Sequence, residues 1–337
     1  MPQPSPYNRP WKSFDEQMTL LEERGLSVTD REWALAWLRR VGYYRLSAYW
    51  YPFRVFRHEQ DATTGAIRSV RTDDFVPGTA FSDAVGLYLF DRQLRVLLAD
   101  ALERIEVSLR VEIAYRLGQA DTFAHLHADN FHPTFRDRTD TRTGQTAFAT
   151  WQQKYQGLVQ RSREDFVEHY RERHGPDLPI WVAIEVWDFG AVSQLLGMMK
   201  VTDQQAIARR YGIDDWQAFA SWVRSLSYLR NLVAHHSRVW NRNMVSEPKM
   251  PALAAIPWTA HFSGKADLLS KPFVYLAIAR HLVDLICPGS EWALRIAEHL
   301  RAFPAQSSQR KQSVSAMGAP EDWQGWWPVT AQKRTSA

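Results

Sequence analysis

Hydrophobic positions recur along most of this chain at the spacing of an α-helix. The longest such run covers residues 81–118, in which leucine and isoleucine follow one another every three or four positions: Leu94, Leu98, Leu102, Ile105, Leu109, Ile113 and Leu117. This spacing places them on one face of a single long helix, and Gly118 is suited to end it. The charged residues between them, from Arg92 to Glu112, are expected on the opposite, solvated face.

Polar start signals predict shorter helices on both sides of this run. Capping boxes, in which a hydroxyl residue precedes a glutamate or glutamine by three positions, occur at Ser13–Glu16, Thr29–Glu32 and Thr202–Gln205. An acidic pair at 214–215 precedes a further apolar pattern. The helices predicted from these signals and from the periodicity cover residues 13–24, 30–41, 151–173, 181–199, 202–211, 214–239, 266–286 and 290–302.

Residues 53–78 are the region that favours β-structure. Apolar residues such as Val55 and Ile67 flank a polar stretch, and Pro77-Gly78 closes the segment, which predicts a small hairpin or an irregular excursion. The predicted fold class is therefore all-α. The expected organisation is an N-terminal helical segment at 1–52, the connector or hairpin at 53–78, a helical core at 79–303 and a partly mobile tail at 304–337.

The composition is that of a folded protein with a mild basic excess. Of the 337 residues, 45% are hydrophobic and 23% are charged, which excludes a disordered or fibrous chain. The 41 Lys and Arg against 37 Asp and Glu give a net charge of +4, which permits an anionic partner without requiring one. Cys287 is the single cysteine, which excludes an internal disulfide and a cysteine-based zinc site and indicates a reducing compartment.

Neither a targeting segment nor a membrane span is expected. The first ten residues are proline-rich and polar, unlike a secretory signal. The most apolar run, residues 273–287, is interrupted by Arg280, His281 and Asp284 and is too short to cross a bilayer. We therefore expect a soluble, cytoplasmic protein without a membrane partner.

The segment with the most chemical content is SLSYLRNLVAHHSRVWNR, residues 225–242. On a continuous helix the apolar stripe would comprise Trp222, Leu226, Leu229, Val233 and Trp240. A neighbouring face would comprise Arg224, Tyr228, Asn231, His235 and Arg238. His236 lies seven positions after Leu229, so it is expected to point toward the apolar side as a structural residue. His235 is the better candidate for chemistry.

Arg230 and His235 together suit RNA cleavage. The phosphodiester of RNA carries its own nucleophile, the 2′-hydroxyl. A histidine can accept its proton or protonate the leaving 5′-oxygen, and a guanidinium can hold the phosphate oxygens, so no metal ion is required. Asn231 could orient His235 or bind phosphate. Five positions place Arg230 and His235 about 140° apart on an ideal helix, so a shared site requires the arginine to wrap or a second helix, as in a homodimer.

The basic and aromatic character of this segment favours contact with RNA. Between positions 230 and 250, one acidic residue, Glu247, stands against four basic residues: Arg230, Arg238, Arg242 and Lys249. Aromatic residues among basic ones are typical of single-stranded RNA binding, although Trp240 also suits a core. Arg45, in the aromatic segment YYRLSAYWY, is a further RNA-binding candidate because packing explains it least. The spacing of Arg230 and His235 alone is also compatible with a solvated helix end that has no catalytic role.

Other kinds of site have less support. His125, His127 and His132 lie in a polar region that lacks a plausible carboxylate geometry for a metal site, and are interpreted as surface histidines. The sequence contains no nucleophile elbow and no glycine-rich phosphate loop. No metal ion or cofactor is expected.

Several segments resemble one known family. RNLVAHHSRVWNR resembles the hallmark of the Abi family of abortive-infection bacteriophage-resistance proteins, of the AbiD/AbiF-like kind. Five other segments resemble that family in the expected order: GYYRLSAYWYPFR (42–54), LYLFDRQLRVLL (87–98), IEVSLR (105–110), PIWVAIEVWDFG (179–190) and MGAPEDW (317–323). The resemblance covers most of the chain.

The Abi family is in turn similar to the HEPN superfamily of all-α domains, many of which dimerise and carry an arginine, four to six residues and then a histidine. In this chain that pattern falls on Arg230 and His235, with Asn231 following the arginine and His236 and Arg238 in support. The resemblance implies a HEPN-like helical bundle, metal-independent RNA cleavage leaving a 2′,3′-cyclic phosphate, and a possible regulatory RNA or antitoxin. Ser237 stands where some HEPN toxins have a tyrosine, so a mechanism that uses this tyrosine does not carry over.

Four further charged residues have two interpretations. In one interpretation they orient Arg230 or His235, and in the other they form buried ion pairs that fix helix packing. The four residues are Glu106, Arg110, Glu185 and Asp188. The function of the whole protein also has two alternative interpretations. The first is a non-catalytic module that binds RNA or a partner through the same basic segment, and the second is a helical scaffold that does not bind nucleic acid.

Overall fold

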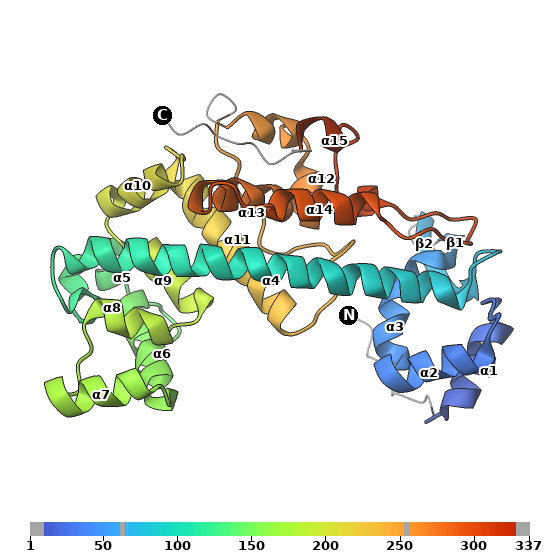
Figure 1. The fold of residues 1–337 in the computed structure, drawn as a ribbon, viewed down its shortest axis with the longest axis horizontal. Coiled ribbons are helices and arrows are strands. Elements are labelled where there is room, and N and C mark those ends of the chain that lie inside the picture. Colours follow the sequence, from blue (N-terminus) through green and yellow to red (C-terminus); the bar gives the residue numbers. More distant parts are fainter. Residues whose placement is uncertain (1–9, 61–64, 66, 253–255, 328–337) are drawn as a thin grey trace. The chain divides into compact units, whose positions relative to one another are not determined.

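The computed structural model describes residues 10–60, 65, 67–252 and 256–327, and confirms the predicted all-α class. The helices of more than one turn are α1 (Phe14–Glu23), α2 (Arg31–Val41), α3 (Tyr43–Trp50), α4 (Phe81–Gly118), α5 (Pro133–Asp137), α6 (Ala147–Arg161), α7 (Asp165–His174), α9 (Phe189–Met198), α10 (Val201–Arg210), α11 (Trp216–Ala234), α13 (Pro272–Ile286) and α14 (Trp292–Arg301). Single turns form α8 (Ile180–Ala183), α12 (Ala266–Leu269) and α15 (Trp323–Trp326) (Figure 1).

The chain forms two compact units. The first contains residues 1–93 and 301–314, and the second contains residues 94–300 and 315–337, so both are discontinuous in sequence and α4 contributes to each. The segment 304–337, expected to be partly mobile, has Ser308 buried in the first unit and Trp327 buried in the second, and its residues 328–337 lie outside the described ones.

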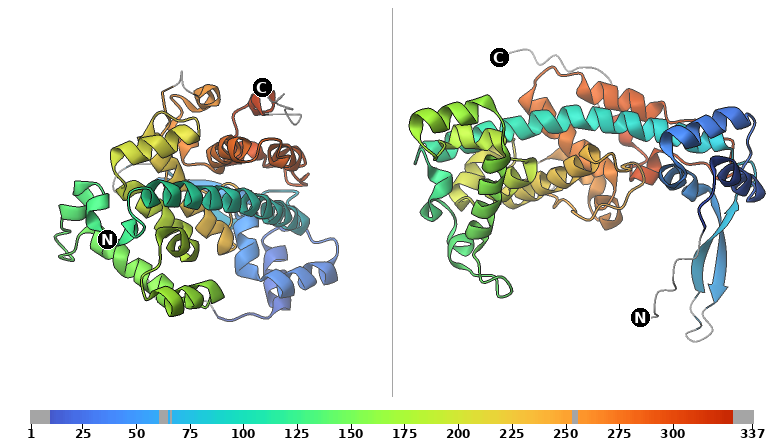
Figure 2. Two further views of the ribbon diagram at one scale, coloured as in Figure 1. Left: turned by 60° about the vertical axis from the view of Figure 1, so that its left-hand side comes forward. Right: turned by 90° about the horizontal axis from the view of Figure 1, so that it is seen from below.

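The first unit joins α1, α2 and α3 to a β-hairpin. β1 (Arg54–Gln60) pairs antiparallel with β2 (Ile67–Phe75), with Arg57 opposite Val70, which confirms the hairpin interpretation of residues 53–78. Figure 2 shows the two strands projecting from the helices of this unit. A buried hydrogen bond from the Tyr49 hydroxyl to Asp91 (2.7 Å) ties α3 to the first part of α4.

One of the three predicted capping boxes forms at the start of a helix. Ser13 and Glu16 form the predicted capping box of α1. The box predicted at Thr29 is wrong, because the Asp30 carboxylate caps α2 by accepting a hydrogen bond from the Trp33 N–H (2.9 Å). The box predicted at Thr202 is also wrong, because α10 begins at Val201 and Thr202 lies within its first turn.

The second unit is built on the apolar stripe of α4. All seven stripe residues predicted from Leu94 to Leu117 are buried, and the helix ends at Gly118 as predicted. The opposite face is not uniformly solvated, since Arg95 and Glu106 are buried as well. Helix α11 contacts α9, α10 and α13 in the same unit. Among the described residues, no helix combines the length and the apolar character that crossing a membrane requires.

Candidate functional site

The site lies where α11 ends. The Asp215 carboxylate caps the first turn of this helix, and the last turn closes with two hydrogen bonds typical of a Schellman motif. The Ser237 N–H donates to the Leu232 carbonyl (2.9 Å) and the His236 N–H donates to the Val233 carbonyl (3.0 Å). His236 has φ 54°, in the left-handed region that glycine usually fills at this position of the motif. The prediction that the helix continues to residue 239 is therefore wrong.

This turn changes where the two histidines lie. His235 is the C-cap residue directly after α11, with its N–H still bonded to the Asn231 carbonyl (3.0 Å), and both His235 and Asn231 are exposed. His236 is also exposed, so the prediction that it points into the apolar side is wrong. The physical reason is the left-handed residue, which ends the helical repeat. For the same reason Arg238 does not share a helix face with His235.

Arg230 is anchored by an ion pair to α4. Its Nε lies 3.5 Å from Oε2 of Glu106, and the Glu106 carboxylate also accepts a hydrogen bond from Arg110 (2.7 Å). Arg110 in turn donates to the Trp187 carbonyl (2.7 Å) and lies 3.5 Å from Glu185. One buried carboxylate thus connects two guanidinium groups, one on α4 and one on α11.

The carboxylates around Arg230 have shifted pKa values. Burial raises the pKa of Glu106, against the opposing effect of the positive charges of Arg110 and Arg230. Burial also acts to raise the pKa of Asp188, but hydrogen bonds from Lys154 (3.0 Å) and the Ala191 N–H (2.6 Å), with the charge of Arg230, lower it overall. Arg230 is therefore close enough to both carboxylates to affect their ionisation.

The remaining predicted residues are placed as follows. Arg238 and Arg242 are half-buried after the turn, where an Arg242 Nη1 donates to the Arg238 carbonyl at 3.5 Å. Trp240 is fully buried, as the core interpretation predicts. Arg45 is exposed on α3, in the other unit.

Two contributors were missed by the sequence analysis. Lys154 on α6 pairs with Asp188, and buried Arg95 on α4 reaches the Ser237 carbonyl (3.4 Å) just after the histidines. The α4 periodicity placed Arg95 on the solvated face, and no local signal marked Lys154, because both contacts join residues far apart in the chain.

The three loop histidines do not form a metal site. His125 is buried beside the rings of Tyr155 and Trp187, so its interpretation as a surface residue is wrong; burial lowers its pKa to about 4. His127 pairs with Asp121 (2.5 Å), and His132 caps α5. Across the described part of the chain, no cluster of histidine, cysteine, aspartate and glutamate could hold a metal ion.

Comparison with known proteins gives a family. No curated protein matches the chain, and no solved structure matches it. A family model described as Abi-like protein matches residues 36–241, well over half of the chain and including Glu106, Arg110, Arg230 and His235. The chain therefore belongs to the Abi-like protein family.

Proposed function

We propose that this protein is a metal-independent endoribonuclease of the HEPN type that acts in abortive-infection defence against bacteriophage. Membership of the Abi-like family supports the defence role. The observation that carries the catalytic proposal is the end of α11, where Arg230 is fixed by buried Glu106 and His235 is exposed five residues later.

The two side chains would divide the chemistry. His235 accepts the proton of a 2′-hydroxyl, whose oxygen attacks the adjacent phosphorus, and the bond from phosphorus to the 5′-oxygen breaks. Arg230 stabilises the charge that develops on the phosphate oxygens. An arginine has five N–H donors, so the contact with Glu106 leaves others for the phosphate. The products are a 2′,3′-cyclic phosphate and a 5′-hydroxyl.

A homodimer would complete this site. About 140° separates Arg230 from His235 around the helix axis, so their side chains diverge within one copy. Two copies that meet at the ends of α11 would place the arginine of one beside the histidine of the other. In that dimer a second His235 protonates the leaving 5′-oxygen.

The test is incubation of purified protein with RNA, followed by mapping of the product ends. Arg230→Ala and His235→Ala are each expected to abolish cleavage while the protein stays folded. Arg173→Ala and His174→Ala, which alter exposed residues of α7, are the matched controls and should cut normally. Continued cutting by both site variants contradicts the proposal, as does activity that EDTA removes.

A non-catalytic RNA-binding module is the competing outcome of the same experiment. The basic residues of the segment would then bind intact RNA with an affinity that falls steeply with salt. Binding of this kind without any product after long incubation would favour it over the nuclease.

A further inference from the structure

Two exposed aromatic side chains flank a cavity near the end of α4. The cavity has a volume of about 420 Å³ and is lined by Tyr115, Trp181, Val111 and Ile184 among others. Tyr115 is 67% exposed and Trp181 is 48% exposed, although both are large and partly apolar. The volume of the cavity lies within the range of small-ligand sites, about 300–1,000 Å³. Exposed aromatic residues around a cavity mark a binding surface.

Trp181 is held in place by its neighbours. The edge of its ring lies against Gly118, where an added Cβ would stand 3.4 Å from the indole. Ile180 and Ile184, on either side of Trp181 in the sequence, are fully buried and anchor the turn that carries it. The indole is therefore a supported platform and needs little ordering when a flat ring stacks on it.

Charged groups border this cavity on the side of the proposed catalytic site. Arg110 and Glu185, which lie 3.5 Å apart, both line it. Arg110 shares the Glu106 carboxylate with Arg230. Nine residues of helix separate Glu106 from Tyr115, which is about 13 Å along the axis of α4.

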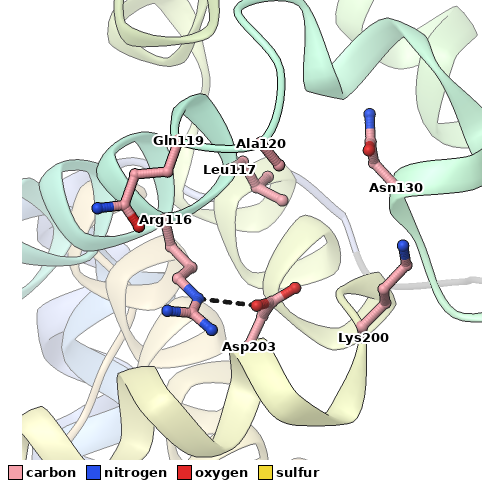
Figure 3. Close-up of a pocket in the computed structure, with 7 residues that line it drawn as sticks. All are labelled: Arg116, Leu117, Gln119, Ala120, Asn130, Lys200 and Asp203. Atoms are coloured by element: carbon pink, nitrogen blue, oxygen red, sulfur yellow. Dashed lines mark hydrogen bonds and ion pairs between the residues drawn. The ribbon is translucent and has the colours of Figure 1, made fainter.

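A second cavity, of about 290 Å³, adjoins the first at the C-terminal end of α4. Gln119 lines both cavities, and the second also contains Arg116, Lys200 and Asp203. In Figure 3 the Arg116 guanidinium is paired with Asp203, at 2.8 Å, and Lys200 stands at the start of α10. Two cations against one carboxylate leave this cavity positive.

We propose that the cavity between Tyr115 and Trp181 binds one unpaired base of the RNA substrate. This assignment rests on the proposed nuclease function. An aromatic platform beside a cavity with a positive excess matches the alternation of bases and phosphates in a single strand. The base stacks on Trp181, and a flanking phosphate lies toward Lys200.

The charge of the surroundings favours RNA over a second copy of the chain as occupant. A second copy would have to present an acidic group to the side of Lys200 and an apolar group to Trp181. RNA supplies both features in every nucleotide, because each base is followed by a phosphate.

The test measures binding separately from cleavage. Fluorescent ten-nucleotide oligo(A) and an abasic ribose-phosphate decamer are titrated against the full chain carrying His235→Ala, which is expected not to cut. Adding Trp181→Ala should weaken oligo(A) binding by about 5- to 100-fold and leave abasic binding unchanged, because one stacked base is lost. Trp181→Phe should keep most of the affinity, and Trp11→Ala, at another exposed tryptophan, should keep all of it.

Each alternative result is informative. Equal affinity of Trp181→Ala and its parent for oligo(A), or an equal loss on the abasic decamer, overturns the base site. So does a Trp181→Ala variant that dissociates a dimer without changing RNA affinity, which would identify a second copy as the occupant. If Trp181→Ala fails to fold, Tyr115→Ala replaces it, since Tyr115 is more exposed. RNA that binds as expected but is never cut by the wild type refutes the nuclease and leaves the base site standing.

Discussion

Glu106 forms an ion pair with Arg230, with 3.5 Å between Oε2 of the glutamate and Nε of the arginine. The Glu106 side chain is 8% exposed, whereas the Arg230 side chain is 37% exposed. The carboxylate is fixed on the long helix α4, and a hydrogen bond from Arg110 keeps it there. The guanidinium therefore has one defined anchor while part of it remains open to solvent. Such an arrangement suits a group that must meet a phosphate in one geometry.

Glu106→Gln should reduce RNA cleavage by about 10- to 100-fold, because the neutral amide holds Arg230 less firmly and small displacements are costly in catalysis. The loss should appear in kcat rather than KM, since Glu106 positions the arginine and does not bind RNA itself. Single-turnover kinetics measure it, with urea unfolding to show that the variant stays folded. Glu112→Gln is the matched control on the same helix, where the carboxylate pairs with Arg210 (3.3 Å). An equal loss in both variants would contradict a specific role for Glu106.

Local patterns predicted α4, but not the contacts between distant elements. The helices predicted at 151–173, 181–199 and 266–286 are each interrupted in the structure, as α6 and α7, α8 and α9, and α12 and α13. Leu94 to Leu117 gave α4 because one helical face repeats regularly over the whole run. The pairing of Glu106 with Arg230 joins residues 124 positions apart, so no spacing within α11 reveals it. The end of α11 could not be predicted either, because its stop depends on a histidine in a backbone conformation that sequence patterns assign to glycine.

His236 should carry a measurable backbone cost. Its φ of 54° places a side chain in the left-handed region, which costs an ordinary residue about 1–2 kcal/mol relative to glycine. His236→Gly should therefore be more stable than His236→Ala by about 1 kcal/mol, because both variants lack the imidazole and glycine alone relieves the strain. Urea unfolding of the two variants measures the difference. Equal stability would show that the turn is not strained at this residue.

Protein stability should fall as the pH drops, through His125. Burial lowers its pKa from 6.5 to about 4, and neither ring nitrogen has a hydrogen-bond partner among the described residues. The unfolded chain therefore binds a proton at higher pH than the folded chain, so the stabilisation is complete above pH 6.5 and is lost progressively toward pH 4. The contribution amounts to about 1.4 kcal/mol per pH unit in this window, or about 2 kcal/mol between pH 7.5 and pH 5.

His125→Phe separates this residue from other titrating groups. Between pH 7.5 and pH 5, the free energy of unfolding of the His125→Phe variant should change by about 2 kcal/mol less than that of the wild type, because phenylalanine does not titrate. His174→Phe, at an exposed histidine, should follow the wild type. The same slope in His125→Phe and the wild type would show that His125 is protonated in the folded protein.

The chemistry of the cut identifies the nucleophile. If the 2′-hydroxyl attacks, an RNA with a single 2′-deoxy nucleotide on the 5′ side of a mapped cut should resist cleavage there, while the same change two nucleotides away should have no effect. The upstream product should end in a 2′,3′-cyclic phosphate, which mass spectrometry distinguishes from a 3′-hydroxyl. Cleavage should continue in EDTA, because Arg230 supplies the charge stabilisation that a metal ion would otherwise provide. Cutting at the 2′-deoxy position would require another nucleophile, such as water, and His235 could not then act as the base for a 2′-hydroxyl.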